Sequence, residues 1–566
     1  MIIAVISLLT TASLCFLYGT LTIQLLVFIT GKKFQLEEIE PSHIFWLGLI
    51  LICWMLMLLS FFIKIGMIVT VIIGSVGLIT LFIQAKPLYQ YYKSIQWNQF
   101  SNLLTVMLGI FFLIFIILKT TNPEYHYDSG LYYIQSIKWI ENYPIVPGLG
   151  NLHGRFAFNS NWFLLSALFG FGSFLPYRVY ILNIFVVLLT GFFLLKKISR
   201  LPHDKTNSCI FSLLVFCYSI RNCYIAANSP TTDLPVHLLI WVILVLLLEK
   251  NEQSTLSNWD IRSWIIFLLV IFGITIKVST VPTLLIPLYI LINSSRKNRK
   301  IFWQVFLIGS LFLIPWLIRN VILSGTILYP LSFLLLPWFD WNIPAINVQE
   351  MSKTILSWAM IPWVPKEIVL NLSFLDWFSA WFHNRSVKEL ISLIASNIGI
   401  SLFFFMDARY TIKNRHTPYQ DHSFWLFLDA FFILSLFYWF ISAPDPRFIT
   451  GLIVSAFMYF ILRIFKPLLT TPIPGKILQY IALILMLLFT SRSINQPSFK
   501  TNFLFPAKVP IFQTESTLIS PGLLIYMPID GDQCWDAPLP CSKSPYPGLV
   551  LRGNTLAEGF KISPSN

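Results

Sequence analysis

The sequence predicts an all-α polytopic membrane protein, a bundle of about 14 membrane spans. Hydrophobic residues make up 56% of its 566 positions and charged residues only 11%, whereas soluble proteins carry roughly 25% charged residues. The mean hydropathy is +0.73. Apolar runs close to the ~20 residues that cross a bilayer recur along the chain, so its length does not divide into soluble domains.

These apolar runs place the expected spans in order along the chain. They cover residues 3–29, 44–62, 65–85, 103–119, 177–195, 209–226, 236–248, 263–276, 281–292, 301–319, 388–407, 424–442, 448–463 and 477–490. The first run has no basic stretch before it and no small-residue cleavage site. We therefore expect a retained span there rather than a signal peptide.

The basic loops set the expected orientation. A net charge of +14 is also typical of proteins that bind nucleic acid. Here, however, the basic residues cluster in short loops between spans, a bias that marks cytoplasmic loops, and we expect no nucleic-acid partner. The basic loops are KKISRLPHDK (196–205), SSRKNRK (294–300), RYTIKNRH (409–416) and residues 463–476.

The other connections then fall on the outer face. They are residues 120–176, 320–387 and 491–566, with the short loops 228–235 and 442–448. The first of them contains DSGLYYIQSIKWIEN, whose apolar residues recur at helical spacing, and the short apolar stretch NSNWFLLSALFGF. We expect both stretches to be helices that lie along the outer membrane surface.

The chain divides into three parts by this topology. Residues 1–102 form additional N-terminal membrane helices, and residues 103–490 form a membrane core. Residues 491–566, rich in Pro, Gly and Ser, form a small irregular tail on the outer face. No internal repeat is visible, which disfavours a transporter built from inverted repeats.

Residues 263–292 lie between two charged loops that are expected on the same side of the membrane. At 1.5 Å per residue they reach about 45 Å, too little for two crossings of a ~30 Å core. We expect two short helices that meet at IKVSTVP (276–282) inside the protein, because irregular backbone is tolerated at membrane depth only there. Lys277 lies at the tip of this hairpin, where a lysine is costly and functional by default.

The cysteines separate into two groups. Five lie in or beside apolar runs and are expected to act as small hydrophobic residues: Cys15, Cys53, Cys209, Cys217 and Cys223. Cys534 and Cys541 belong to CWDAPLPC in the tail, where a disulfide suits an oxidising outer compartment. No histidine or second cysteine pair lies near, which disfavours a zinc site.

Several charged residues lie near the outer ends of spans although they are far apart in the chain. Asp128 follows the span 103–119, Asp233 precedes the span 236–248, and Lys277 is at the hairpin tip. Arg319 lies in PWLIRN and Arg447 in PDPRF. A helical bundle can gather these groups around one cavity, and His126 and Arg155 are further candidates from the outer segment 120–176.

This pattern resembles the GT-C class of integral membrane glycosyltransferases. YDSGLYY is similar to the class's acidic motif in the first outer loop, with Ser129 in place of the second acid. FGITIKVSTVP resembles the Leu-Thr-Lys hairpin of the protein O-mannosyltransferase and aminoarabinose transferase relatives. PWLIRNVILSGTILYPL and DPRFITGLI are similar to two later segments of those relatives, with Thr326 and Ile327 in place of Asn-Pro. HYDSGLYY, VPGLGNLHGRFAFNSNWF and GDQCWDAPLPC also resemble a family of bacterial multi-pass membrane proteins, from which no activity follows.

The resemblance implies a GT-C-like bundle that moves a sugar from a polyprenyl-phosphate carrier to an envelope glycan, lipid or protein. The implied setting is the outer face of a bacterial cytoplasmic membrane. Asp128 would be the general base. Lys277, Arg319 and Arg447 would stabilise the leaving phosphate. Asp233, His126 and Arg155 would bind donor or acceptor; no cofactor is certain, and a divalent metal at Asp233 is possible.

Each of these assignments has a structural alternative. Asp128 and Asp233 both precede expected helices and suit N-caps. Lys277 suits a side chain that reaches the membrane interface, Arg319 an ordinary span-end charge, and Arg447 a partner for Asp445. For the whole protein, a transporter or flippase of lipid-linked glycans, or a polymerase or ligase that uses diphosphate-linked glycans, is the alternative function.

Overall fold

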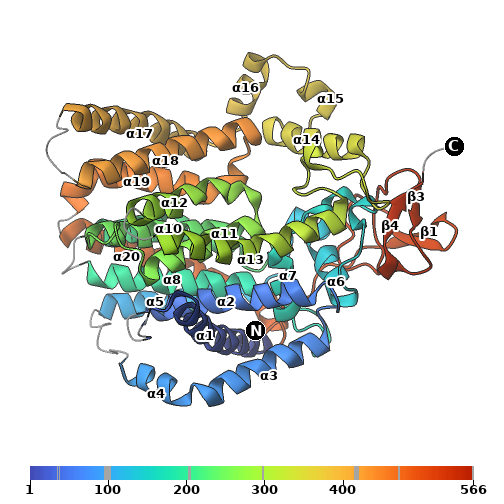
Figure 1. Ribbon diagram of the computed structural model, residues 1–566, viewed down its shortest axis with the longest axis horizontal. Coiled ribbons are helices and arrows are strands. Elements are labelled where there is room, and N and C mark those ends of the chain that lie inside the picture. Colours follow the sequence, from blue (N-terminus) through green and yellow to red (C-terminus); the bar gives the residue numbers. More distant parts are fainter. Residues whose placement is uncertain are drawn as a thin grey trace.

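The computed structural model describes residues 1–32, 34, 36, 39–94, 103–201, 206–295, 299–413, 420–469 and 472–563. Most of these residues are helical, and the long helices run side by side as one bundle (Figure 1). The helices of the bundle are α1 (Ile2–Thr30), α2 (Pro41–Leu59), α3 (Met67–Ile83), α4 (Ala85–Ser94), α5 (Leu103–Leu118), α8 (Leu182–Arg200), α9 (Asn207–Ala226), α10 (Asp233–Glu252), α11 (Ile261–Ile276), α12 (Leu285–Ser295), α13 (Arg299–Ser324), α17 (Val387–Lys413), α18 (Gln420–Ser442), α19 (Thr450–Leu469) and α20 (Pro472–Ile494).

A helix occupies each expected span, but fewer helices qualify as independent crossings. In the described part of the chain, nine helices are long and apolar enough to cross a membrane, or up to ten if the bent pair α3 and α4 counts as one. α3 occupies the expected span 65–85, and the chain bends by 73° after it, where α4 begins. α11, the helical stretch Val278–Ser294 and Gln479–Ile494 are shorter apolar helices. The protein is a helical polytopic membrane protein.

The two ends of the bundle differ. The β-strands, α6 (Ile134–Asn142) and α14 (Ala345–Met360) gather at one end, on the right in Figure 1, whereas α17 ends and α18 begins at the other end. α15 (Lys366–Val369) and α16 (Phe374–His383) lie beyond α14. The segments expected on one face therefore collect at one end. Parts of all four basic loops lie outside the described residues.

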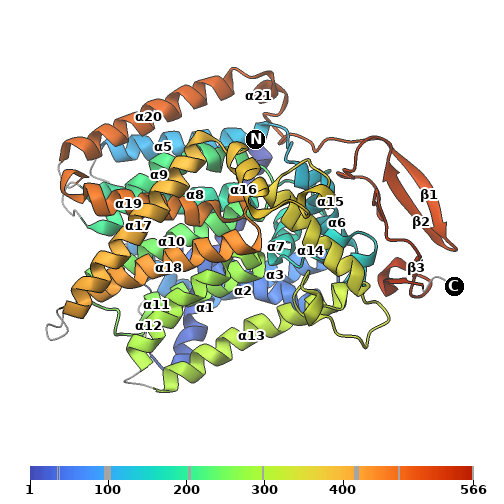
Figure 2. The same ribbon diagram turned by 90° about the horizontal axis from the view of Figure 1, so that it is seen from above.

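The expected hairpin is present. α11 ends at Ile276, a 3₁₀ stretch, η7, covers Val278–Leu284, and α12 then returns beside α11 (Figure 2). Lys277 is the residue between the two helical stretches. Pro282 lies within η7, where a proline suits a short irregular helix.

One expectation for the outer segment 120–176 is wrong. α7 (Asn161–Phe169) does not lie on a membrane surface, because all nine of its residues are buried and it contacts α2 and α6. Its sequence, NWFLLSALF, has no polar face, and a helix that is apolar all round belongs in a core. α6 is buried along one face and contacts α7.

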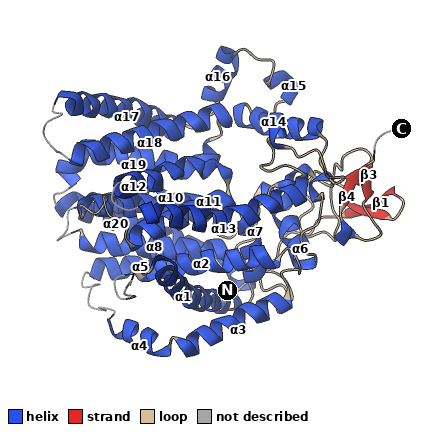
Figure 3. Ribbon diagram, in the orientation of Figure 1, coloured by secondary structure: helices blue, strands red, loops and turns tan. Residues whose placement is uncertain are grey.

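The C-terminal tail is more ordered than expected. It contains α21 (Pro497–Thr501) and four short strands, which are the strands drawn in Figure 3. β1 (Thr514–Ser520) pairs antiparallel with β2 (Leu523–Pro528), and β3 (Leu549–Leu551) pairs antiparallel with β4 (Phe560–Ile562). Leu523, Ile525, Leu549 and Phe560 share a buried cluster with Trp139 to Phe156 of the outer segment, so the tail packs on that segment.

Candidate active site

Asp128 lies at the centre of a group of charges. One carboxylate oxygen accepts from Arg155 at 3.3 Å, and the other accepts from Arg447 at 3.0 Å. Asp128 is only 4% exposed, whereas the side chains of Arg155 and Arg447 are 26% and 46% exposed. The carboxylate is therefore held inside, and its two arginines reach toward the surface.

Arg447 joins Asp128 to a second carboxylate. Its Nε lies 3.8 Å from Asp233 Oδ2, and Lys277 Nζ donates to Asp233 Oδ1. The ammonium of Lys277 also lies 4.5 Å from the centre of the Phe448 ring, a cation–π distance. The continuous set Arg155, Asp128, Arg447, Asp233 and Lys277 is called the charged network below.

The local fold explains how five distant residues meet. Asp128 precedes a π-helical turn, η4 (Ser129–Tyr133). Such turns are rare, and those that occur are often found at functional sites. Arg155 lies in the 3₁₀ turn η6 (Gly154–Ala157) and Arg447 in the 3₁₀ turn η9 (Pro446–Ile449). Asp233 begins α10, and Lys277 lies at the break of the hairpin. Each of these side chains thus lies in a short turn or at the end of a helix.

The structure does not support a simple N-capping role for Asp128. Asp128 stands at the N-cap position of η4, but its side chain makes no capping hydrogen bond. Asp445 does cap η9, because its carboxylate accepts the backbone N–H of Arg447 at 2.9 Å. The guanidinium of Arg447 is turned instead toward Asp128 and Asp233. The carboxylates of the charged network are therefore held by cations.

Neutral groups support Arg155 and Asp128. The backbone N–H of Arg155 donates to His153 Nδ1 at 3.2 Å, and burial together with the Arg155 charge lowers the pKa of His153 to about 3. The His153 ring is therefore neutral and able to accept. The Arg155 guanidinium lies 5.6 Å from the Tyr132 ring, and burial and the Asp128 carboxylate raise the pKa of Tyr132. Tyr132 therefore stays a neutral phenol.

A third carboxylate beside the network was missed by sequence reasoning. Glu124 is 6% exposed, and its Oε1 accepts from the backbone N–H of His126 and from Ser129 Oγ, both at 2.8 Å. Ser129 Oγ also lies 2.9 Å from Ser229 Oγ. Ser129 stands where the resembled motif has a second acid, and its hydroxyl donates to Glu124. The only sequence signal was the presence of Glu124 in EYHYDSG.

His126 lies close to the network without joining its ion pairs. It lines a cavity of about 180 Å³ together with Asp233, Arg447 and His237. His126 Nδ1 and His237 Nε2 are buried and have no hydrogen-bond partner in the described part of the chain. Two unsatisfied imidazole nitrogens favour a polar occupant in this cavity.

Arg319 is the one candidate that the structure places elsewhere. Its guanidinium donates to Asn159 Oδ1 at 3.1 Å and to Ser60 Oγ. Among the described residues it contacts no carboxylate, and it lines a separate small cavity with Trp139 and Phe163. Its hydrogen bonds connect α13 to α2 and the outer segment, and we assign it a structural role.

A metal site is not evident near the network. In the residues that the structure describes, no three His, Cys, Asp or Glu side chains gather closely enough to hold a metal ion. Asp233 is instead occupied by Lys277 and Arg447. The chemistry of the site is therefore argued from its own cations.

The tail holds the segment that follows Asp128. A disulfide joins Cys534 and Cys541, as the sequence predicts. The backbone N–H of Trp535, inside the loop, donates to Gly130 at 2.9 Å, and Gln135 donates to the carbonyls of Trp535 and Ala537. Gly130 leaves no room for a Cβ beneath the Trp535 ring. The disulfide loop thus fixes the turn that carries Asp128.

Loss of the disulfide should loosen this turn. For Cys534→Ser with Cys541→Ser, the loop-entropy model predicts a loss of about 2–3 kcal/mol, because the sequence separation is 7 residues. We expect faster hydrogen exchange over residues 128–138. The paired variant Cys217→Ser with Cys223→Ser, in α9, is the control. Unchanged exchange over 128–138 would contradict the assigned role of the loop.

A family model described as "Domain of unknown function (DUF8201)" matches residues 1–454. The chain belongs to this family. The matched residues contain every member of the charged network and end before the tail. No curated protein and no solved structure matches the chain. The function is therefore argued from the geometry of the site.

Proposed function

We propose that this protein is a GT-C-type glycosyltransferase that takes a sugar from a polyprenyl-phosphate carrier. Its setting would be the cytoplasmic membrane of a bacterium, with the charged network facing the exterior or periplasm and up to about 14 helices within or across the bilayer. The acceptor would be an envelope glycan, lipid or protein. The observation that carries the proposal is the charged network itself, with Asp128 between two arginines and Lys277 at a broken hairpin.

The charge of the network suits this donor. Its three cations and two carboxylates leave a net charge of +1. A sugar joined to a polyprenyl phosphate is a phosphodiester with one negative charge, so the two are complementary. Arginine is well suited to phosphate because its planar fork binds two oxygens at once. The half-exposed Arg447 is the first cation that an approaching phosphate would meet.

The reaction is a single displacement. An acceptor hydroxyl oxygen bonds to the anomeric carbon while the bond from that carbon to the phosphate oxygen breaks. The hydroxyl proton goes to Asp128, and the electron pair leaves with the polyprenyl phosphate, whose new charge the arginines and Lys277 stabilise. One carboxylate suffices for this path, which inverts the anomeric centre.

Donor binding also explains why the base is paired with two arginines. In the absence of donor, Arg155 and Arg447 each occupy one oxygen of the Asp128 carboxylate. A phosphate that draws Arg447 away would free Asp128 Oδ2 to accept a hydrogen bond from the acceptor hydroxyl when the substrate is in place. While the site is empty, the pairing with both arginines keeps the buried carboxylate neutralised.

The test is sugar transfer by purified protein in detergent. Donors with a small panel of radiolabelled sugars would be incubated with envelope extract as acceptor, and the label would be followed from lipid to product. We expect one donor class to give product at a rate proportional to enzyme. If no donor gives product while intact donor crosses the membrane of proteoliposomes, the protein is a transporter and the proposal is wrong.

The pair of Asp233 and Lys277 separates a functional role from a structural one. Lys277→Met alone leaves a buried carboxylate without its main partner, which costs about 3–5 kcal/mol in a fully buried pair and less here, because Lys277 is 21% exposed. Lys277→Met with Asp233→Asn should recover most of the melting temperature. It should still lack transfer activity, because the donor phosphate has lost a cation. Recovery of activity with stability would make the pair structural only.

A further inference from the structure

A large cavity in the described part of the bundle lies far from the charged network. It has a volume of about 1040 Å³ and is lined by residues of α1, α2, α5, α8 and α11. Glu249 near the end of α10 lines it, whereas Asp233 at the start of α10 belongs to the network. At 1.5 Å per residue these two positions are about 24 Å apart. The cavity therefore lies toward the other end of the bundle, where α8 ends at Arg200.

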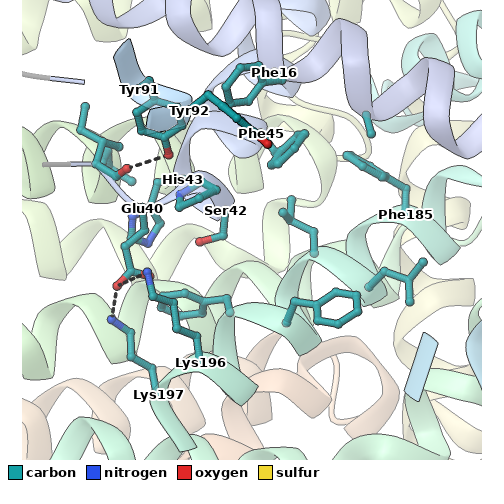
Figure 4. A pocket seen from close by; sticks show the side chains of 18 of the residues that line it. Phe16, Glu40, Ser42, His43, Phe45, Tyr91, Tyr92, Phe185, Lys196 and Lys197 are labelled. Carbon is teal, nitrogen blue, oxygen red and sulfur yellow. Dashed lines mark hydrogen bonds and ion pairs between the residues drawn. The ribbon is translucent and has the colours of Figure 1, made fainter. Parts of the chain in front are cut away.

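One side of this cavity is charged with an excess of cations. Lys196, Lys197, Arg200 and Arg262 line it, against the carboxylates Glu40 and Glu249. Figure 4 shows Glu40 between Lys196 and Lys197.

The ion pairs among the described residues leave three of these cations without a close carboxylate partner of their own. Lys197 is 2% exposed and pairs with Glu40 at 2.7 Å and with Glu249. Lys196 and Arg200 each come only within 3.9 Å of the same Glu40 oxygen that Lys197 occupies. Among the described residues, Arg262 donates to the neutral side chain of Gln253. The described lining residues therefore hold more positive charge than Glu40 and Glu249 neutralise.

The buried imidazole of His43 offers a hydrogen-bond donor to an anion in this cavity. His43 is 4% exposed and lines the cavity, and its Nε2 has no hydrogen-bond partner in the described part of the chain. The imidazole lies 5.2 Å from the Phe193 ring, which fixes its position at the border between the charged and apolar sides. A protonated or neutral imidazole in this place donates to a phosphate oxygen.

The other side of the cavity is aromatic and aliphatic. Phe16, Phe45 and Phe185 line it (Figure 4), with Leu8, Leu113 and Ile117. The volume is at the upper end of the ~300–1,000 Å³ typical of ligand sites. An occupant must therefore be amphipathic, with an anionic head and a hydrocarbon body. Basic pockets between membrane helices are known to bind anionic lipid headgroups.

We propose that this cavity is a binding site for an anionic glycerophospholipid of the surrounding membrane. Its phosphate contacts Lys196, Arg200 and Arg262, with His43 as a further donor, and its acyl chains lie against the phenylalanine rings. The site is separate from the charged network and does not depend on the proposed transferase activity. It gives the N-terminal helices α1 and α2 a role in holding lipid against α8 and α11.

The test is native mass spectrometry of the full-length protein, delipidated in detergent and titrated with phosphatidylglycerol. We expect a retained phosphatidylglycerol and at least tenfold weaker binding of phosphatidylcholine with the same chains. Lys196→Ala with Arg200→Ala should weaken phosphatidylglycerol binding by about tenfold or more. The control is Arg409→Ala with Lys413→Ala, an exposed Arg and Lys at the same spacing on α17, which should leave binding unchanged.

A second variant tests the proposal even if the double variant does not fold. Ala12→Phe adds a ring from α1 into the cavity and keeps every charge, and it should also reduce binding about tenfold. Equal binding of phosphatidylcholine, or undiminished binding by both variants, would overturn the proposal. Displacement of phosphatidylglycerol by a polyprenyl phosphate at equal concentration would also overturn it, because the cavity would then serve the carrier lipid.

Discussion

Asp128→Asn should lower the rate of sugar transfer by a factor of about 10²–10⁴, or roughly 3–5 kcal/mol of barrier. Asparagine keeps the size of the side chain but does not accept a proton at useful pH. The structure places the Asp128 oxygens on Arg155 and Arg447, and an amide oxygen still accepts from one of them. Donor binding should therefore change little, and the chemical step should carry the loss. The measurement is single-turnover transfer at saturating donor.

The control for this variant is Asp376→Asn. Asp376 is an exposed carboxylate of α16 that accepts from Ser373 Oγ and makes no ion pair among the described residues, and its change should leave transfer unaffected. The melting temperature of both variants is compared with that of the unmodified protein. Near-normal transfer by Asp128→Asn would remove Asp128 as the base. Glu124, which bonds with Ser129, would then be the next carboxylate to test.

Arg447→Ala should harm both donor binding and turnover. Arg447 is the only residue of the network that contacts both carboxylates, and its loss reduces the net charge of the network to zero. We expect the KM for donor to rise about tenfold or more and kcat to fall by about 10²–10³-fold, because the cation acts on both the bound phosphate and the leaving group. Arg447→Lys should lie between, since it keeps the charge but loses the planar fork.

Arg552→Ala is the matched control. Arg552 pairs with Asp340 at 3.0 Å at the surface of the tail, and its removal should change neither constant. The exposed pair is also expected to contribute little to stability. If Arg447→Ala lowered the melting temperature but kept normal kinetics after correction for folded protein, Arg447 would be a structural link between η9 and α10, and the phosphate-binding role would be wrong.

Much of this site was accessible from sequence because of where its charges lie. A charged residue beside an apolar run has few structural reasons to be there, so Asp128, Asp233, Lys277 and Arg447 stood out. The broken hairpin followed from length alone, since 30 residues do not cross a bilayer twice. The structure joins these four residues and Arg155 in one set of ion pairs.

The rest depended on tertiary packing. Arg319, like Arg447, lies at the end of an expected span, yet its guanidinium donates to Ser60 and Asn159, because α13 packs on α2. Glu124 was overlooked because its contact with Ser129 forms only when the chain turns after α5. The strands of the tail are short and pair locally, and they need the apolar surface around Trp139 to cover them.

The most direct test of the account is the identity of the lipid that remains after reaction. Purified protein would be given a polyprenyl-phosphate sugar and envelope acceptor, and the lipids would be analysed by mass spectrometry. We predict one polyprenyl monophosphate for each sugar transferred, with release reduced about 10²-fold or more in Asp128→Asn. Recovery of only intact donor, or release of polyprenyl diphosphate from a diphosphate-linked glycan, would contradict the proposed reaction at the charged network.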